Sequence, residues 1–443
     1  MTEPNHTSRR SFLKRSGGIV AATTLGAHLG VARSAHASGS DMIKLGLIGC
    51  GKRGRGAVAD CLAADKNIKL VAVADAFEDM ITPGIRILSQ ARPGQVDVKP
   101  DRIFVGLDAY RKVLASDVDL VLLASPPGFR PYHYRAAVEA GKHIFMEKPC
   151  CVDAPGYRSL LESNKLAEEK NLKVGVGFQR RHQQHYREIV ERIRNGQFGD
   201  IQFFRAYFNT AGVWSRPRTP DQTEMEYQIR NWYYFVWLSG DHIVEQHVHN
   251  LDVANWIRGA HPVEAQGMGG REVRKFGPRG DFGHIYDHHS VEFTYADGTK
   301  LFSQCRHIPG CWQTASEHTH TAQGYVSTDE RGYMIYGPDG KRISRSRAKG
   351  RRSYDQEHVD LIDAIRNDKK YLEGPIGAEA SLSAILGRMA TYSGNVVRWD
   401  EAAADGPSEM PKEFAWNAAP PVLPDKEGSY EHAVAMPGRY KAY

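Results

Sequence analysis

The feature that most constrains this chain is a glycine-rich loop between a predicted buried strand and a predicted helix. Residues 43–48 (Ile-Lys-Leu-Gly-Leu-Ile) have the apolar character of a buried strand, and residues 57–64 that of a helix. Directly after the strand, residues 49–54 read Gly-Cys-Gly-Lys-Arg-Gly. A G-x-G-x-x-G segment between a strand and a helix predicts a dinucleotide-binding fold.

Each glycine of this loop has its own task in such a fold. Gly49 permits the tight turn, Gly51 lets the backbone approach the pyrophosphate, and Gly54 allows the helix to pack closely on the strand. The phosphates then lie at the helix N-terminus, where free N–H groups and the helix dipole favour anions. Lys52 and Arg53 belong to the same loop, so we include both among the predicted cofactor contacts.

The second predicted strand, residues 69–74, ends at Asp75, about 20 residues beyond the loop. A carboxylate at this position accepts hydrogen bonds from the ribose hydroxyls and repels a 2′-phosphate. Ala76 follows it, where an arginine would suit a 2′-phosphate. The sequence therefore favours NAD over NADP, although Lys52 and Arg53 soften that preference.

Two further apolar strands continue this alternating pattern. Residues 120–124 run into Ser125 and Pro126, and residues 143–146 run into Glu147 and Lys148. Ligands bind at the carboxyl ends of parallel strands, so we expect these four side chains to contact the cofactor. The first part of the chain is thus predicted to be an α/β Rossmann domain.

The pattern changes after residue 200. Residues 201–207 alternate apolar and polar side chains, and the strands at 290–295 and 300–306 are joined by an Asp-Gly turn. This predicts an α+β C-terminal domain with a mainly antiparallel open sheet. Helices at about 354–367 and 378–393 are expected to pack back on the first domain.

The expected organisation has four parts. They are a signal peptide at residues 1–37, an NAD-binding domain at 38–170, a substrate and oligomerisation domain at 171–400, and a C-terminal arm at 401–443.

Together with the glycine loop at residues 49–54, two further segments make the chain resemble the Gfo/Idh/MocA oxidoreductases, which include glucose–fructose oxidoreductase and inositol dehydrogenase. Residues 140–149 read Ala-Gly-Lys-His-Ile-Phe-Met-Glu-Lys-Pro, and residues 245–252 read Glu-Gln-His-Val-His-Asn-Leu-Asp. The second segment departs from the usual D-x-G-x-H-x-x-D pattern, since Glu245 replaces Asp and His247 replaces Gly. The resemblance spans roughly residues 41–400 and implies a sugar or polyol substrate.

The resemblance also implies catalytic roles. Lys148 is expected to project toward the nicotinamide and donate to the reacting oxygen. His249 is the best base, because an imidazole titrates near neutral pH. Glu245 lies four residues earlier and would share a helix face with His249, so it could orient the ring or take its proton onward. Asp252 either stabilises this segment or contacts substrate hydroxyls.

His247 and His249 form an H-x-H pair. Together with Glu245, these side chains are of the types that bind metal ions. Residues 248–258 are predicted to be helical, however, and alternate residues of a helix point in different directions. We therefore predict no metal at this place.

Aromatic side chains precede this segment. Trp232 and Tyr233 are candidates to stack on a sugar. About half of the aromatic rings in this stretch are expected to be buried in the core instead. Arg180, just after a strand end, is a further candidate, because the resemblance places substrate contacts there.

The charge distribution indicates location rather than a partner. The chain has 58 Lys and Arg against 52 Asp and Glu, a net +6. Five of the basic residues and one acid fall in the first 37, so the remainder, at about +2, shows no nucleic-acid signature. Residues 8–14 (Ser-Arg-Arg-Ser-Phe-Leu-Lys) form a twin-arginine motif, and residues 35–37 an Ala-His-Ala cleavage site. We expect periplasmic or other export by that route, and no membrane span after signal removal.

Cysteine usage leaves one question open. Cys305 and Cys311 could pair in an oxidising compartment or remain buried thiols.

The sequence thus predicts an exported oxidoreductase that transfers hydride between a sugar or polyol and a tightly bound NAD, as a homodimer or homotetramer. The alternative is a glycoside hydrolase that uses NAD transiently to oxidise the sugar, eliminate the aglycone and reduce again. A non-enzymatic sugar sensor is a third reading, against which an intact Lys148 and His249 argue.

Overall fold

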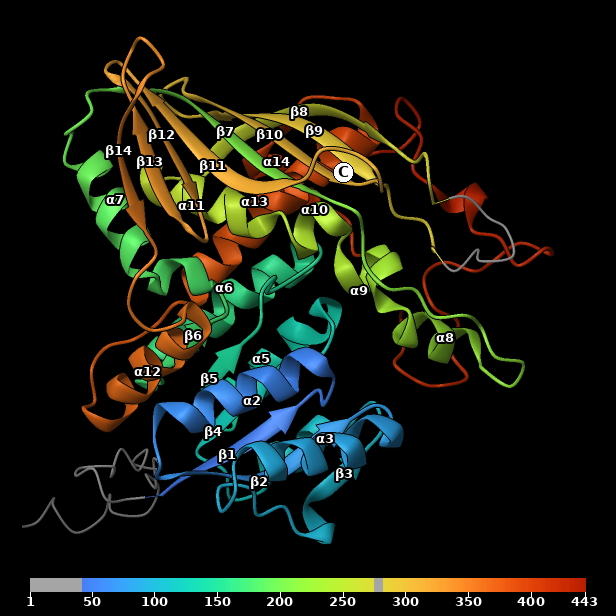
Figure 1. Cartoon of the computed structure of the whole chain (residues 1–443). Coiled ribbons are helices and arrows are strands. Elements are labelled where there is room, and N and C mark those ends of the chain that lie inside the picture. The colour runs from blue at the N-terminus through green and yellow to red at the C-terminus, as the bar shows by residue number, and fades with distance from the viewer. Residues whose placement is uncertain (1–41, 275–281) are drawn as a thin grey trace, which may run out of the picture.

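Two sheets, one parallel and one mostly antiparallel, organise the computed structural model, which describes residues 42–274 and 282–443 (Figure 1). The expected signal peptide, with its twin-arginine motif and cleavage site, lies outside the described residues.

The first sheet has six parallel strands in the order β3-β2-β1-β4-β5-β6. Its central strands consist almost entirely of buried aliphatic residues, as in sheets that helices cover on both faces. The strand order reverses between β1 and β4, and ligands bind beside such a switch point. The strands are β1 (Ile43–Ile48), β2 (Ile68–Asp75), β3 (Ile103–Val105), β4 (Leu120–Leu123), β5 (His143–Met146) and β6 (Val174–Val176).

Helices connect these strands and cover the sheet (Figure 1). α6 begins where the Asp153 carboxylate accepts a hydrogen bond of 2.8 Å from the Gly156 N–H, which satisfies one free donor of the first turn. The connecting helices are α2 (Lys52–Ala64), α3 (Glu78–Ala91), α4 (Ala109–Ala115), α5 (Arg130–Glu139) and α6 (Ala154–Glu169).

The parallel sheet extends past the expected boundary at residue 170. β6 pairs with β5, with Val174 opposite Ile144. The late helix α12 (Ser353–Arg366) packs against α2, and its Leu361 lies in the same apolar core as Leu45. A helix from late in the sequence therefore completes the first domain. This agrees with the prediction that the helix at about 354–367 packs on that domain.

The second sheet has nine strands in the order β14-β13-β12-β11-β7-β10-β9-β8-β15. Only β7 and β10 pair in parallel among these neighbours. The predicted Asp-Gly turn joins β9 to β10, and Gly298 has the positive φ of 86° that such a turn needs. The strands are β7 (Ile201–Thr210), β8 (Pro262–Gly270), β9 (His288–Tyr295), β10 (Lys300–His307), β11 (Thr314–Thr321), β12 (Gly324–Asp329), β13 (Gly332–Tyr336), β14 (Arg342–Arg347) and β15 (Val397–Arg398).

Helices lie between this sheet and the first domain (Figure 1). The longest, α13 (Gly374–Ser393), is buried along almost its whole length and packs against α6 of the first domain, as predicted. The remaining helices of this part of the chain are α7 (Gln184–Arg194), α8 (Glu224–Arg230), α9 (Val236–Ser239), α10 (His242–Glu245), α11 (Val248–Arg258) and α14 (Trp399–Asp405), with α8 lying to one side (Figure 1).

The C-terminal segment beyond α14 contacts both domains. The ring of Phe414 lies 5.4 Å from that of Phe129, and the ring of Trp416 lies 5.4 Å from that of Phe77. The backbone carbonyl of Val422 accepts a hydrogen bond of 2.7 Å from Gln228. The segment thus ties α8 of the second domain to the first domain.

The predicted fold class is confirmed: a Rossmann-type parallel sheet is followed by a domain with a mostly antiparallel sheet. Cys305 and Cys311 are both free thiols. Within the described ranges, no helix combines the length and apolar character required to cross a bilayer.

Candidate active site

Two adjoining hollows open at the carboxyl ends of the parallel strands. One follows β1, β2 and β4 and contains the glycine loop and Asp75. The other lies after β4 and β5 and receives side chains from both domains. Ser125 and Trp232 line both hollows, so the two form one continuous cleft. Of the predicted site residues, the second hollow brings together Arg53, Ser125, Glu147, Lys148, Arg180, Trp232, Glu245 and His249.

The glycine loop has the geometry that the sequence predicted. Gly49 has φ of +99°, and a Cβ there would lie 2.6 Å from the backbone of Ser125. A Cβ on Gly54 would lie 1.9 Å from the carbonyl oxygen of Gly49. A Cβ on Gly51, in contrast, would meet no atom within 4 Å. The loop is therefore closed toward the protein and open toward the cleft, which fits a pyrophosphate lying over Gly51.

Asp75 ends β2 at the wall of the first hollow, beside Pro126. Its two carboxylate oxygens accept backbone hydrogen bonds from Cys50 at 2.6 Å and Phe77 at 3.0 Å. Burial raises the pKa of Asp75, and these N–H donors oppose that effect. Each oxygen keeps a further lone pair for a ribose hydroxyl, so the carboxylate is held in place for the predicted contact.

Lys148 and Glu245 meet across the domain boundary. The Lys148 Nζ donates to Glu245 Oε1 at 3.0 Å and also to the Glu245 backbone carbonyl. Both side chains are only 12% exposed. Burial raises the pKa of Glu245, while the Lys148 ammonium lowers it.

His249 lies at the start of α11 and lines the same hollow. Its ring is 5.9 Å from that of Phe178 in an edge-on arrangement, and its buried Nδ1 has no hydrogen-bond partner among the described residues. Burial, and next the Lys148 ammonium, lower the pKa of His249 well below its usual value. The imidazole is therefore neutral at physiological pH and able to accept a proton.

The expected relation between Glu245 and His249 is not found. Glu245 is the last residue of α10 and α11 begins at Val248, so no single helix carries both side chains. The described structure records no hydrogen bond between the two. The i, i+4 spacing was misleading because the helix breaks between them, and Glu245 instead holds Lys148.

His247 and His249 also diverge. The Nε2 of His247 lies 2.6 Å from Ser303 Oγ on β10, in the buried interior, while His249 faces the cleft.

Arg53 and Glu147, two of the predicted cofactor contacts, pair with each other. The Arg53 Nε donates to Glu147 Oε1 at 2.5 Å, and its Nη2 donates to Glu357 of α12 at 3.3 Å. Both residues line the second hollow and are absent from the lining of the first, which holds Gly51 and Asp75. Lys52 is exposed at the first turn of α2.

Arg180 lies in the short turn Gln179–His182 after β6 and is 2% exposed. Its Nη1 donates to Glu317 of β11, which also accepts from Asn250 at 2.6 Å and Tyr186 at 2.9 Å. Burial raises the pKa of Glu317 to about 6, against the lowering effect of Arg180. Among the described residues the Arg180 Nε has no hydrogen-bond partner, so this guanidinium keeps a donor for a ligand in the hollow that it lines.

Two predicted substrate contacts lie outside the cleft lining. Asp252 is 1% exposed, and its carboxylate accepts three hydrogen bonds of 2.8 to 3.1 Å from Arg181. Tyr233 is 2% exposed and its ring stacks on that of His307 at 5.9 Å, whereas Trp232 lines the cleft. Asp252 thus stabilises its segment, and Tyr233 belongs to the buried half of the aromatic cluster.

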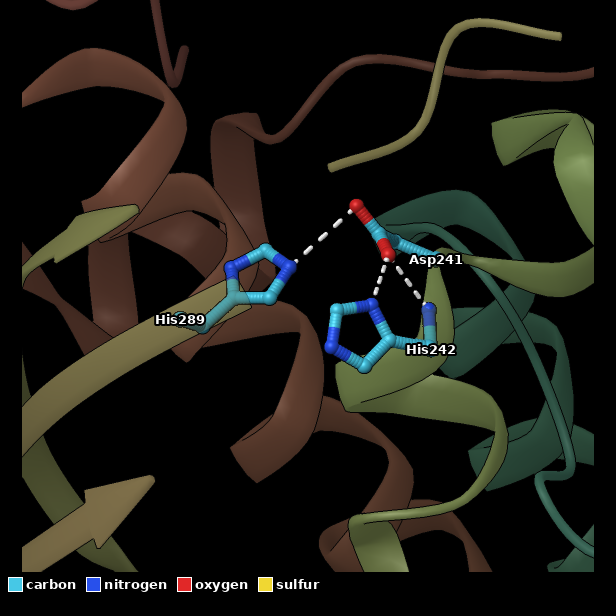
Figure 2. Close-up of side chains that lie close together, drawn as sticks. All are labelled: Asp241, His242 and His289. Atoms are coloured by element: carbon cyan, nitrogen blue, oxygen red, sulfur yellow. Dashed lines mark hydrogen bonds and ion pairs between the residues drawn. The ribbon is translucent and has the colours of Figure 1, made fainter. Parts of the chain in front are cut away.

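Asp241, His242 and His289 form a buried group that the sequence reading missed (Figure 2). Their nearest ligand-type atoms lie within 4.8 Å of one another. The carboxylate of Asp241 already accepts hydrogen bonds from Tyr392 at 2.6 Å and from the Tyr286 N–H at 2.9 Å, besides those from His242. Asp241 has φ of +76°, rare for a residue with a side chain. We interpret the group as the hydrogen-bonded support of α10, which ends at Glu245.

Other cleft residues were also missed. Phe208, Gln246, Glu330 and Tyr354 line the second hollow from β7, the α10–α11 junction, the β12–β13 turn and α12. They come from distant parts of the chain. Gln246 lies inside the 245–252 segment, whereas no local motif marks Phe208, Glu330 or Tyr354.

Two family models match the chain. The model described as an oxidoreductase family with an NAD-binding Rossmann fold, GFO/IDH/MocA, matches residues 43–178. The GFO/IDH/MocA C-terminal domain matches residues 186–324. Together they cover more than half of the chain and include every residue of the Lys148, Glu245 and His249 group.

Curated relatives include inositol 2-dehydrogenases. That of Rhizobium meliloti is 26% identical over 291 residues, which is 65% of this chain and 76% of the relative. That of Klebsiella pneumoniae is 32% identical over 216 residues, 48% of this chain and 54% of the relative.

Solved structures share the fold. Aldose-aldose oxidoreductase from Caulobacter crescentus, complexed with glycerol, has a TM-score of 0.62 at 15% identity. A levoglucosan dehydrogenase in complex with NADH and levoglucosan has a TM-score of 0.63 at 16% identity. Each comparison covers 81% of this chain and 99% of the other.

Proposed function

The chain belongs to the GFO/IDH/MocA family of oxidoreductases, and on that premise we propose that it transfers hydride between a carbon of a sugar or polyol and a tightly bound NAD. The observation that carries the proposal is the convergence of Lys148, Glu245 and His249 in one hollow beside the glycine loop. A proton donor, a carboxylate and a neutral imidazole at the end of a nucleotide cleft are what alcohol oxidation requires.

The choice of NAD rests on the first hollow. Gly51 leaves space for a pyrophosphate, and Asp75 offers a fixed carboxylate at the position where a 2′-phosphate would be repelled. When bound, the nicotinamide supplies the hydride acceptor. The curated inositol 2-dehydrogenases and the solved sugar oxidoreductases support a polyol or sugar as the other reactant.

The protein groups then have distinct tasks. The neutral His249 takes the hydroxyl proton, because its low pKa leaves the ring free to accept it. The Lys148 ammonium donates to the reacting oxygen and stabilises its negative charge in a site screened from water. Glu245 holds Lys148 in place from the second domain. Arg180 and Trp232 line the wall against which the sugar would lie.

The test uses the purified full chain. We would extract and identify any bound nucleotide, then incubate the protein with D-glucose, myo-inositol and levoglucosan and follow NADH, with and without added NAD. We expect oxidation of at least one polyol or sugar, with NAD preferred. Absence of any redox change with every sugar, in protein shown to bind NAD, would contradict the proposal.

The same preparation decides between oxidation and the hydrolase alternative. Aryl glycosides are added without free NAD. Release of the aglycone with no net NADH would contradict simple oxidation and support the hydrolase mechanism, in which transient oxidation is followed by elimination and reduction.

We further propose export by the twin-arginine route, on the motif at residues 8–14 and the cleavage site at 35–37. Replacing Arg9 and Arg10 by Lys should retain the protein in the cytoplasm of an expressing bacterium. Export of the double variant at the normal level would contradict this proposal.

We also propose a homodimer or homotetramer that forms through the open face of the nine-stranded sheet. Phe302 on β10 and Met268 on β8 are exposed there, at 43% and 78%. Light scattering on the purified protein tests this, and a monomer at micromolar concentration would contradict it.

A further inference from the structure

A chain of three side chains leads from the interior to the cleft and ends at Gln246. The Nη2 of Arg274 lies 2.8 Å from the Nδ1 of His307. The Nε2 of His307 lies 3.1 Å from the Oε1 of Gln246. Arg274 is 3% exposed and His307 2% exposed, while Gln246 is half-buried and lines the hollow that holds Lys148 and His249.

The direction of every hydrogen bond in this chain follows from Arg274. A guanidinium has only donors, so the Nδ1 of His307 must accept. A neutral imidazole that accepts at Nδ1 carries its proton at Nε2 and donates there. The Oε1 of Gln246 therefore accepts. Burial lowers the pKa of His307, which agrees with a neutral ring.

This direction fixes the carboxamide of Gln246. With its oxygen turned to His307, its NH₂ group points the other way, and the described structure records no partner for that nitrogen. The His249 N–H donates to the Gln246 backbone carbonyl at 3.3 Å. Gln246 and His249 line the same hollow, so the free NH₂ group belongs to the cleft that also holds the imidazole that takes the proton.

We propose that Gln246 is a specificity-determining residue whose NH₂ group donates to a second oxygen of the substrate, on a carbon next to the one oxidised. Arg274 and His307 are its positioning residues. The inference rests on the proposed function and narrows the substrate class. The cleft is built for compounds with oxygen on neighbouring carbons, as in polyols and sugars, and discriminates against simple alcohols.

The first test needs no activity. In protein labelled with ¹⁵N-histidine, the His307 signals are assigned by their loss in His307→Gln. We expect a neutral ring protonated at Nε2 in the wild type. In Arg274→Met the Nδ1 loses its donor, and the preference for that tautomer should weaken. A wild-type His307 protonated at Nδ1, or at both nitrogens, would overturn the inference even if the enzyme oxidises sugars.

The second test is kinetic and uses whichever of D-glucose, myo-inositol and levoglucosan the wild type oxidises, together with its monodeoxy analogues. Gln246→Leu keeps the size of the side chain and removes its donor. We expect kcat/KM to fall about tenfold for the full substrate. For the analogue that lacks the contacted hydroxyl, wild type and variant should be nearly equal. A similar loss on every analogue, or no loss at all, would overturn the contact.

Matched variants separate contact from folding. Gln90→Leu removes an exposed glutamine of α3, away from the cleft, and should leave kcat/KM unchanged. Arg274→Met should raise KM with little effect on kcat. Arg274→Lys keeps a donor toward His307, so its KM should lie close to that of the wild type. If Lys and Met variants behave alike at equal unfolding temperature, the positioning role is contradicted. Failure of the wild type to oxidise any sugar would count against the proposed function and leave the tautomer test in force.

Discussion

The Lys148 Nζ lies 3.0 Å from the Glu245 Oε1, so the cation that follows β5 of the parallel sheet is held by a carboxylate from α10 of the second domain. The same ammonium also donates to the backbone carbonyl of Glu245. Lys148 can therefore be fixed only when the two domains are closed on each other. The geometry of the proposed active site is therefore a property of the domain interface rather than of either domain.

The first prediction concerns Lys148. Lys148→Met keeps the length of the side chain and removes the ammonium that would stabilise charge on the reacting oxygen. We expect kcat to fall by roughly 10²- to 10³-fold, with NAD affinity close to that of the wild type. Steady-state kinetics and nucleotide fluorescence measure the two quantities. Lys165→Met, at an exposed position of α6, is the control and should retain full activity; an active Lys148→Met would remove Lys148 from the mechanism.

The second prediction concerns the pH dependence of oxidation. The pKa of His249 is lowered, so the neutral ring that accepts the proton persists below the ordinary histidine pKa of about 6.5. The acid limb of kcat/KM should therefore fall below that pH. A pH–rate profile of the wild type checks this. An acid limb with its midpoint at or above pH 6.5 would contradict the prediction.

The third prediction concerns the nucleotide. Asp75→Ala removes the carboxylate that would face the ribose and would repel a 2′-phosphate. We expect the preference for NAD over NADP to shrink by about 10²-fold, because placing like charges side by side costs several kcal/mol. Dissociation constants for both nucleotides give the ratio. Asp101→Ala, at an exposed site, should leave it unchanged; an unaltered ratio in Asp75→Ala would refute the role.

The fourth prediction separates Asp252 from the substrate. Asp252→Ala leaves Arg181 without its buried partner, so the free energy of unfolding should drop by about 3–5 kcal/mol. Since Asp252 is 1% exposed and does not line the cleft, KM should stay near the wild-type value. Denaturant titration and kinetics measure these, and a large rise in KM without loss of stability would restore Asp252 as a substrate contact.

The fifth prediction concerns stability against pH. Burial alone would lower the pKa of His182, but Asp360 at 2.7 Å and Glu373 at 3.2 Å raise it to about 9. Because the pKa is raised in the folded state, protonated His182 stabilises the fold. This stabilisation is fully present below the unfolded pKa of about 6.5 and is lost as pH rises through 9. The wild type should thus lose stability between these pH values, by about 3 kcal/mol at most.

His182→Asn should flatten this dependence. His358→Asn is the matched control, because burial lowers the pKa of that histidine to about 3 and it does not titrate in this window. Denaturant titrations at several pH values between 6 and 9.5 provide the comparison. An equal slope in wild type and His182→Asn would contradict the prediction.

The nucleotide-binding half of the site was predictable because it is local. Gly49, Gly51 and Gly54 lie within six residues. Gly49 needs a positive φ, a Cβ on Gly54 would collide with the Gly49 carbonyl, and Gly51 leaves the loop open toward the cleft. Asp75 could be placed because a strand of regular length carries it to the same sheet edge. In the substrate half, spacing failed. Glu245 and His249 are four residues apart, yet the helix breaks between them and Glu245 turns to Lys148.

Short-range patterns in the sequence were enough to identify the parallel sheet, the glycine loop, the likeness to an oxidoreductase family and the cleft residues Lys148 and His249. Three features became visible only in the folded structure: Asp252 pairs with Arg181, Tyr233 is buried, and Gln246 meets His307. Those outcomes depend on which donor meets which acceptor across segments far apart in the chain, and side-chain pairing of that kind leaves no trace in local periodicity.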